Sequence, residues 1–205
     1  MATIAETALQ FEIPENILKF HELESILREF DPKSGDVKSG ENPTLITANL
    51  PQVLEWLHNM DKPRELEKNP CDTPLLLFDH EVNTEKVLFH YDGSEGSAQI
   101  IKHFIKLFNP RLKSSQATII SPSFIPKSKL SEEKELVTLI NEHFDETFFI
   151  KFNFRKIADF WSYATQTKCN LMVTSKKYQA ELAKVLYHFY KGERWYDKLS
   201  IYLAK

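Results

Sequence analysis

Residues 86–97 read KVLFHYDGSEGS, and this stretch decides the fold class. Its run 87–91 (VLFHY) is rich in β-forming residues and is followed by an Asp-Gly pair, a pattern that predicts a strand and then a turn. Beyond the turn, apolar residues recur at helical spacing, and the Asn-Pro pair at 109–110 is expected to stop that helix. A strand, a turn and a helix in this order predict the start of an α/β unit.

The alternation of β-rich runs with helical patterns continues to the C-terminus. Further strands are predicted at residues 117–120, 147–152, 170–174 and 199–203. Apolar positions at helical spacing between these runs predict three more helices, the first of them capped by Ser131. The order β-α-β-α-β-α-β-α-β predicts a doubly wound α/β domain, with an open parallel five-stranded sheet and helices on both faces.

The N-terminal part carries a shorter version of the same pattern. The expected elements are a strand at 11–13, a helix at 17–30, a strand at 44–47, a helix at 50–57 and a strand at 73–78. This is half of a doubly wound unit and is too short for a sheet of normal size, so we expect it to pack on the C-terminal domain. The predicted units are a smaller α/β half-repeat at residues 1–80 and a domain at residues 84–205.

Composition limits the classes of function. The chain has 205 residues and a net charge of −3, and this lack of basic excess argues against binding to nucleic acid. No apolar run approaches the length of a membrane span, and the N-terminus does not resemble a secretion signal, so we expect a cytoplasmic protein that does not bind membranes. The two cysteines, Cys71 and Cys169, are expected to be reduced thiols. The histidines do not cluster, so no metal site is expected.

The start of the C-terminal domain resembles the opening of a universal stress protein. Asp92 ends the first predicted strand, and Ser94 and Ser97 lie in the turn that leads into the first helix, as in that family. The order and spacing of the later elements also match it. Residues 73–78 (TPLLLF) resemble the last strand of a first domain in tandem members of the family, which implies that residues 1–80 are a truncated first repeat.

The resemblance fails where ATP-binding members of the family carry glycines. Those members have the pattern G-x2-G-x9-G-[ST] after the fourth strand, because glycine lets backbone N–H groups approach phosphate closely. Here residues 174–179 read TSKKYQ and contain no glycine. We therefore expect that the usual ATP-binding loop is lost and that the protein has no cofactor.

A doubly wound sheet places its ligand crevice at the carboxyl ends of the strands. The residues that would hold ATP or AMP there, if the chain binds nucleotide in an atypical way, are Asp92, Ser94, Ser121, Thr174, Ser175 and Lys176. Structural roles are the alternative: Asp92 and Ser94 suit a turn and a helix cap, and Lys176 and Lys177 suit a solvated helix start. Lysines at a helix start oppose the helix dipole, so a bound anion would stabilise them.

The predicted function is non-catalytic association with a protein partner or with a second copy of the chain. The sequence contains neither a nucleophile elbow nor a phosphate loop of the Ser-Gly-Gly type, which argues against an enzyme. The final strand is expected to pair either with residues 75–78 of the same chain or with a second copy in a homodimer, since an unpaired apolar edge invites aggregation. The alternative function is an ATP- or AMP-binding stress sensor.

Overall fold

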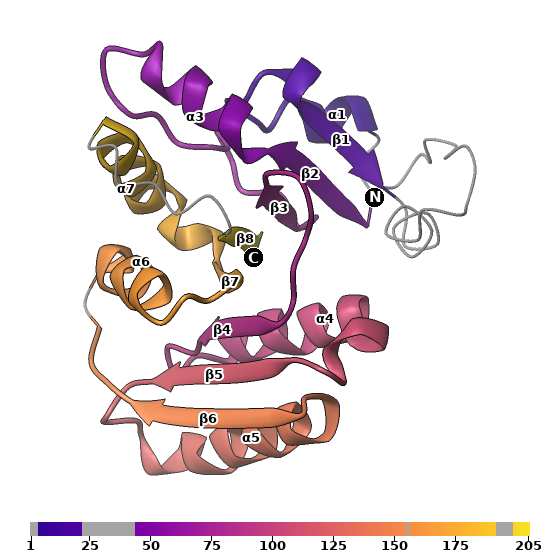
Figure 1. Ribbon diagram of the computed structural model, residues 1–205, viewed down its shortest axis with the longest axis vertical. Coiled ribbons are helices and arrows are strands. Elements are labelled where there is room, and N and C mark those ends of the chain that lie inside the picture. The colour runs from indigo at the N-terminus through magenta and orange to yellow at the C-terminus, as the bar shows by residue number, and fades with distance from the viewer. Residues whose placement is uncertain (1–3, 22–43, 155, 192–198) are drawn as a thin grey trace.

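The computed structural model describes residues 4–21, 44–154, 156–191 and 199–205, and its strands form one eight-stranded sheet (Figure 1). The strand order is β1-β2-β3-β8-β7-β4-β5-β6. The strands are β1 (Leu18–His21), β2 (Leu45–Asn49), β3 (Leu75–Phe78), β4 (Lys86–His90), β5 (Gln116–Ser121), β6 (Glu146–Lys151), β7 (Leu171–Ser175) and β8 (Ser200–Ala204). The helices are α1 (Ile4–Ala8), α3 (Leu50–His58), α4 (Glu95–Leu112), α5 (Leu130–His143), α6 (Ile157–Gln166) and α7 (Gln179–Lys191), with short 3-10 turns η1 (Glu15–Ile17), η2 (Lys127–Lys129) and η3 (Lys176–Tyr178).

Five strands of the C-terminal part form the predicted parallel sheet. β4 lies at its centre, with β5 and β6 on one side and β7 and β8 on the other, and each neighbouring pair is parallel. The chain builds outward from β4 to β6 and then returns to the other side of β4 to continue with β7 and β8. The predicted doubly wound fold class is therefore confirmed, and its switch point lies between β4 and β7.

The N-terminal part extends this sheet by three strands. β3 pairs antiparallel with β8, with Leu75 opposite Leu203 and Leu77 opposite Ile201. β2 then pairs parallel with β3, and β1 pairs antiparallel with β2. The expected pairing of the final strand within the chain is thus present. Because β3 and β7 occupy both edges of β8, that strand has no free edge for the homodimer that was the other expectation.

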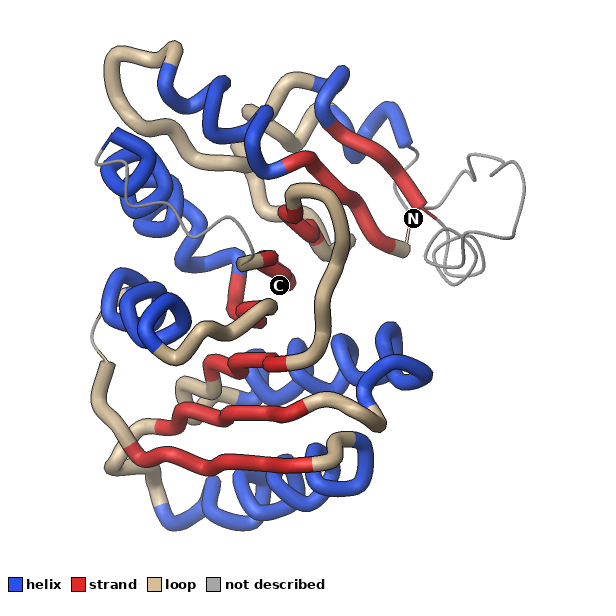
Figure 2. The backbone as a smooth tube through the Cα atoms, viewed as in Figure 1, coloured by secondary structure: helices blue, strands red, loops and turns tan. Residues whose placement is uncertain are grey.

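Two apolar cores cover the two faces of the sheet. Helices α4 and α5 contribute to one core, and α3, α6 and α7 contribute to the other (Figures 1 and 2). Successive residues of a strand point to opposite faces, so Val87 and Phe89 join the first core while Leu88 joins the second. The layer of α3, α6 and α7 does not extend over β6, where Phe148 is 50% exposed.

Two expected elements near the N-terminus are wrong. In place of the first turn of the helix expected at 17–30, the chain forms strand β1, because Leu18 and His21 are buried against β2. The Nε2 atom of His21 lies 2.8 Å from the Oγ1 atom of Thr47. The remainder of that expected helix lies outside the described residues. The strand expected at 11–13 is reduced to a single bridge between Phe11 and Glu67.

Two expected helix boundaries are also wrong. α4 continues through Pro110 to Leu112, whose side chain is fully buried, so packing outweighs the loss of one backbone hydrogen bond at the proline. Ser131 does not cap the next helix, because the 3-10 turn η2 leads directly into α5 at Leu130.

Candidate functional site

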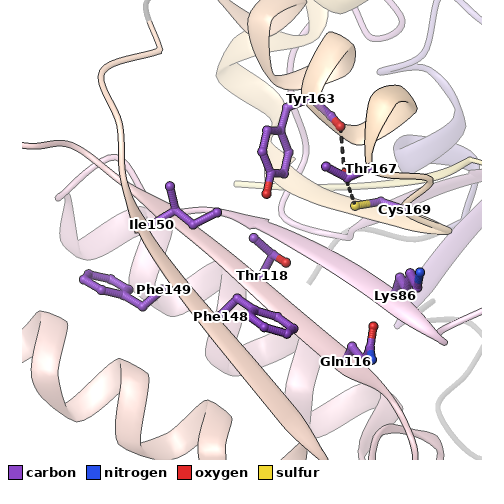
Figure 3. A pocket seen from close by; sticks show the side chains of 9 residues that line it. All are labelled: Lys86, Gln116, Thr118, Phe148, Phe149, Ile150, Tyr163, Thr167 and Cys169. Atoms are coloured by element: carbon purple, nitrogen blue, oxygen red, sulfur yellow. Dashed lines mark hydrogen bonds between the residues drawn. The ribbon is translucent and has the colours of Figure 1, made fainter.

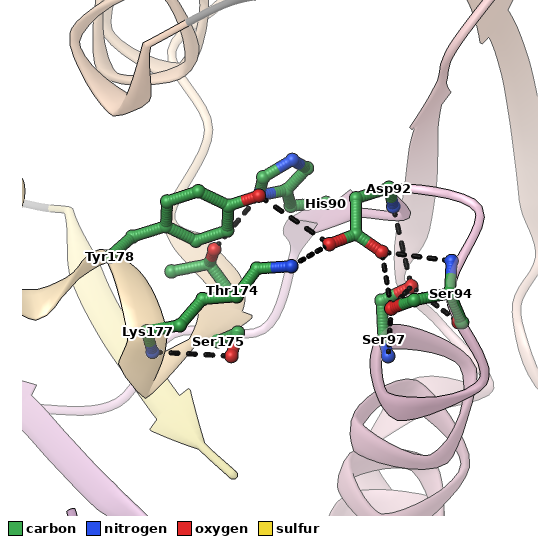
Figure 4. A network of polar contacts seen from close by, with 8 residues as sticks. All are labelled: His90, Asp92, Ser94, Ser97, Thr174, Ser175, Lys177 and Tyr178. Carbon is green, nitrogen blue, oxygen red and sulfur yellow. Dashed lines mark hydrogen bonds and ion pairs between the residues drawn. The ribbon is translucent and has the colours of Figure 1, made fainter.

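The candidate site lies at the switch point, beyond the carboxyl ends of β4 and β7. The end of β4 contributes His90 and the following Asp92, and the end of β7 contributes Thr174 and the 3-10 turn η3 (Figure 4). Strands β4 and β7 are neighbours in the sheet, so side chains at their ends meet although they are more than eighty residues apart in sequence. In a doubly wound fold this is where a ligand would bind.

On the β4 side, Asp92 is fixed by the turn that starts α4. Its Oδ1 atom accepts hydrogen bonds from the backbone N–H of Ser94 at 2.9 Å and from the Ser94 hydroxyl at 2.5 Å. The Ser94 Oγ atom also accepts from the Ser97 N–H at 3.2 Å and caps α4. Gly93 makes the turn at a φ of +82°, and a Cβ atom there would lie 3.1 Å from Ile125. The capping roles expected as the structural alternative for Asp92 and Ser94 are thus present.

The second carboxylate oxygen of Asp92 faces β7, and the chain itself occupies it. The Lys177 ammonium group forms an ion pair with Oδ2, and the Tyr178 hydroxyl donates to the same atom at 3.4 Å. Burial acts to raise the pKa of Asp92, but hydrogen bonds from Lys177, Ser94 and Ser97 outweigh it and hold that pKa well below its usual range. Burial acts to lower the pKa of Lys177, but the bonds to Asp92 outweigh it and raise that pKa. Both groups are therefore charged at neutral pH.

Aromatic rings fill the space beside this ion pair. The His90 ring packs against those of Phe160 and Tyr178, with ring centroids 4.2 Å and 4.9 Å away. Its Nδ1 atom lies 2.9 Å from the Oγ1 atom of Thr174. Burial lowers the pKa of His90 to about 4, so the ring is neutral at pH 7. The expected site residue Thr174 thus contacts a histidine of the same chain.

The structure corrects the expectation for Lys176. Its side chain is 1% exposed and lies among residues of the N-terminal part. The Nζ atom pairs with Glu67 at 2.5 Å and donates to the backbone oxygens of Cys71 and Thr73 at 3.0 Å and 2.6 Å. Ser175 caps the same turn, since its Oγ atom accepts from the Lys177 N–H at 3.3 Å. Because η3 turns tightly, the adjacent lysines point to different places, and Lys176 is not available to a phosphate.

Ser121 also lies apart from the other expected site residues. It ends β5 and is fully buried. Its hydroxyl donates to the Glu133 carboxylate of α5, which also pairs with Lys151 of β6. The Lys151 ammonium group donates to the Ser121 Oγ atom at 3.2 Å. This cluster holds α5 against the ends of β5 and β6. The six expected residues therefore divide among three places.

Sequence reasoning missed three participants in the switch-point site: His90, Phe160 and Tyr178. The pattern of residues 87–91 predicts only a strand for His90, and local spacing does not reveal a ring contact between β4 and α6. Lys177 had been considered as a phosphate ligand rather than as a partner of Asp92. Opposite charges after β4 and β7 in a doubly wound fold were the available signal for that pair.

Two cavities lie beside α6, where the sheet face is only partly covered by helices. One cavity, of about 340 Å³, is bordered by Thr118 of β5, Phe148 of β6 and Tyr163 of α6 (Figure 3). A larger one, of about 650 Å³, lies between Ile150 and Tyr163 and reaches Phe152. Neither cavity is lined by a residue expected for the switch-point crevice.

Comparison with known proteins gives structural likeness only. The sequence matches no family model, and no curated protein sequence matches it. Among solved structures, a universal stress protein from Archaeoglobus fulgidus matches with 13% identity and a TM-score of 0.45, over 80% of this chain and 62% of that one. A universal stress protein in complex with cAMP matches with 13% identity and a TM-score of 0.37, over 58% of this chain and 95% of that one. A member of that family from Burkholderia pseudomallei matches with 11% identity and a TM-score of 0.31, over 44% and 82%.

The matched structures are of the family that the sequence resembles. Since their TM-scores lie below 0.5, the fold class rests on the strand order of this chain. Within the described ranges, no group of three or more histidine, cysteine or acidic side chains is arranged to hold a metal ion. None of the described helices is both long enough and apolar enough to cross a membrane.

Proposed function

We propose that the chain is a universal-stress-protein-like stress-response protein that acts without catalysis, through association with protein, and that its nucleotide crevice is closed by its own side chains. The observation that carries the proposal is the ion pair between Lys177 and Asp92, which joins the two sides of the switch point. A ligand that used Asp92 would first have to displace Lys177 and Tyr178.

The surroundings of the ion pair support closure. The His90 ring packs against two other rings, and Thr174 is already in contact with its Nδ1 atom. The turn after β7 contains Lys176, Lys177 and Tyr178 in place of glycines, so side chains stand where backbone N–H groups would need to approach phosphate. Lys176, the cation best placed in sequence to bind phosphate, is held by Glu67.

The alternative function, an ATP- or AMP-binding sensor, requires a different arrangement of Asp92 and Lys177. A ligand hydroxyl or base edge could bind Asp92 only with Lys177 withdrawn. Withdrawal would leave the Asp92 charge uncompensated near the phosphates, and these like charges repel each other. Ser121 and Lys176 would contribute nothing, since both are buried in other clusters. No contact among the described residues favours this alternative over closure.

A thermal-shift titration with ATP, ADP and AMP in the presence of Mg²⁺ tests the proposal. A ligand at about a hundred times its Kd stabilises a fold by about 2.7 kcal/mol, which a melting curve detects readily. We expect no shift for the wild-type protein or for Lys177→Ala, because the turn after β7 lacks glycine in both. A saturable shift of the wild-type protein would contradict closure and establish nucleotide binding.

A further inference from the structure

Strand β6 is an open edge of the sheet with an apolar centre. In the part of the chain that the structure describes, its one strand neighbour is β5. Its central residues 147–150 (TFFI) carry no charge, and Phe148 and Phe149 are 50% and 39% exposed. Phe152, just beyond the strand, is 53% exposed. An uncharged edge of this kind is a template for pairing with another strand.

We propose that β6 pairs antiparallel with β6 of a second copy of this chain, so that two sheets become one across a two-fold axis. The proposal rests on the association function above and names its partner. It uses the sheet edge opposite the N-terminal strands, since both edges of β8 are already occupied within the chain.

Symmetry restricts the register of such a pair. Residues directly opposite each other in an antiparallel pair point to the same face, and successive residues alternate between faces. A two-fold axis perpendicular to the sheet keeps each residue on its own face, so one residue must lie opposite its own copy. Pairings that place neighbours such as Phe148 and Phe149 opposite each other are therefore excluded.

Charge selects one register among those that remain. With Phe148 on the axis, Asp145 lies opposite Lys151 of the second copy on one face, and the two Phe148 rings meet on the other. Registers centred on Thr147, Phe149 or Ile150 place neither Asp145 nor Glu146 opposite Lys151. Lys151 already pairs with Glu133 within its own chain, but its side chain is 35% exposed and would face Asp145 of the second copy as well. Opposite charges and aromatic pairs each stabilise a cross-strand contact, so the register centred on Phe148 is the one that this sequence favours.

The edge is already in the conformation that pairing needs. The Asp145 N–H donates to the Ser115 carbonyl at 3.0 Å, and the Phe152 N–H donates to the Ser121 carbonyl at 2.8 Å, so the ladder with β5 extends beyond both ends of β6. Figure 3 shows Phe148 and Ile150 on the same face as Thr118, beside Tyr163 of α6. Pairing would make this face continuous between the two copies and would cover apolar surface of both Phe148 rings.

Cysteine cross-linking tests the register. In Phe148→Cys the two new thiols face each other across the axis, within the Cβ separation of about 4.5–5.5 Å typical of opposed residues. In Glu146→Cys, the matched control on the same strand and face, each thiol lies opposite Ile150 of the other copy. We expect mild oxidation to convert Phe148→Cys to a covalent dimer at least tenfold faster than Glu146→Cys or the wild-type protein. Equal rates for the two variants would overturn the proposed register.

Sedimentation velocity tests the interface without cross-linking. The wild-type protein is expected to show a concentration-dependent dimer, and Phe148→Lys, which opposes two like charges on the axis, is expected to raise the dimer dissociation constant at least tenfold. Asp145→Lys should weaken the dimer less, by opposing Lys151. Because both sites are exposed, each variant should keep the wild-type melting temperature as a monomer. A wild-type protein that stays monomeric, including one whose edge pairs with a different protein, would overturn the proposal while leaving closure of the crevice unaffected.

Discussion

Lys176 and Lys177 are adjacent in the sequence and have opposite surroundings. The Lys176 side chain is 1% exposed and pairs with Glu67, whose side chain is fully buried. The Lys177 side chain is 52% exposed and pairs with Asp92 at the mouth of the switch point. The first pair ties the N-terminal part to the turn after β7, and the second joins the two sides of the crevice.

The two pairs differ in burial, and we expect this difference to decide what each pair does for the protein. Removing one partner of a buried pair leaves an uncompensated charge away from water, which is strongly destabilising. Removing the half-exposed Lys177 costs less, because Asp92, at 16% exposed, keeps its two hydrogen bonds from Ser94. The Lys176 pair is therefore expected to act on stability, and the Lys177 pair on whether the crevice is open.

The largest expected effect is loss of the buried partner. Glu67→Ala should lower the free energy of unfolding by about 3–5 kcal/mol, because the Lys176 ammonium group then has no carboxylate to balance its charge and keeps hydrogen bonds to backbone oxygens and a thiol. Urea denaturation measures this loss. Glu65→Ala, two residues earlier and exposed, is the matched control and should change stability by less than about 0.5 kcal/mol. A loss below about 1 kcal/mol in Glu67→Ala would show that the two charges are not buried together.

Replacing both partners sharpens the same comparison. The double variant Glu67→Met with Lys176→Met should be more stable than either single variant, because it removes both charges from the interior and keeps apolar volume. A double-mutant cycle by urea denaturation gives the coupling between them. Additive losses would mean that the pair does not interact.

In the crevice, burial of His90 is expected to make the free energy of unfolding depend on pH. Its pKa is lowered to about 4 in the folded protein, below the ordinary value near 6.5, so protonation favours the unfolded chain. Stability from this group is fully present above about pH 6.5 and is lost as pH falls toward 4. Between pH 7 and pH 4.5 the wild-type protein should therefore lose about 2 kcal/mol more than His90→Gln, measured by urea denaturation at each pH. Parallel losses in the two proteins would contradict burial of the ring.

The smallest expected effect is that of the half-exposed lysine. Lys177→Ala should lower stability by less than about 1 kcal/mol, since the ion pair is open to water on one side. Lys184→Ala, at an exposed position on α7, is the matched control for a lysine without a role in the crevice. A loss in Lys177→Ala comparable to that of Glu67→Ala would remove the distinction between the two pairs.

Local patterns predicted the sheet because they specify its elements directly. The alternation after residue 86 identified all five parallel strands, and the apolar run at 75–78 identified the partner of β8. The strand β1 was missed because Ile17 and Phe20 begin a series of apolar residues at helical spacing. The burial of Leu18 and His21 against β2 decides between strand and helix.

The sequence predicted where the site lies, but it did not predict the directions of the side chains there. The positions of Asp92 and Thr174 followed from where parallel strands end. The direction of each side chain did not, because Lys176 meets Glu67 across 109 residues of sequence and the turn η3 sends Lys177 elsewhere. Ser121 was placed with the others because it also ends a strand, but its partners lie on α5 and β6.

The central claim, that Lys177 closes the crevice on Asp92, is tested most directly by ¹³C NMR of the Asp92 carboxylate during a pH titration. The ion pair and the bonds from Ser94 should keep this carboxylate ionised at every pH at which the protein is folded, and its pKa should rise toward the ordinary value in Lys177→Ala. Addition of ATP with Mg²⁺ should leave the wild-type resonance unchanged. An ordinary aspartate titration in the wild-type protein, or a resonance that moves saturably with ATP, would contradict a closed crevice.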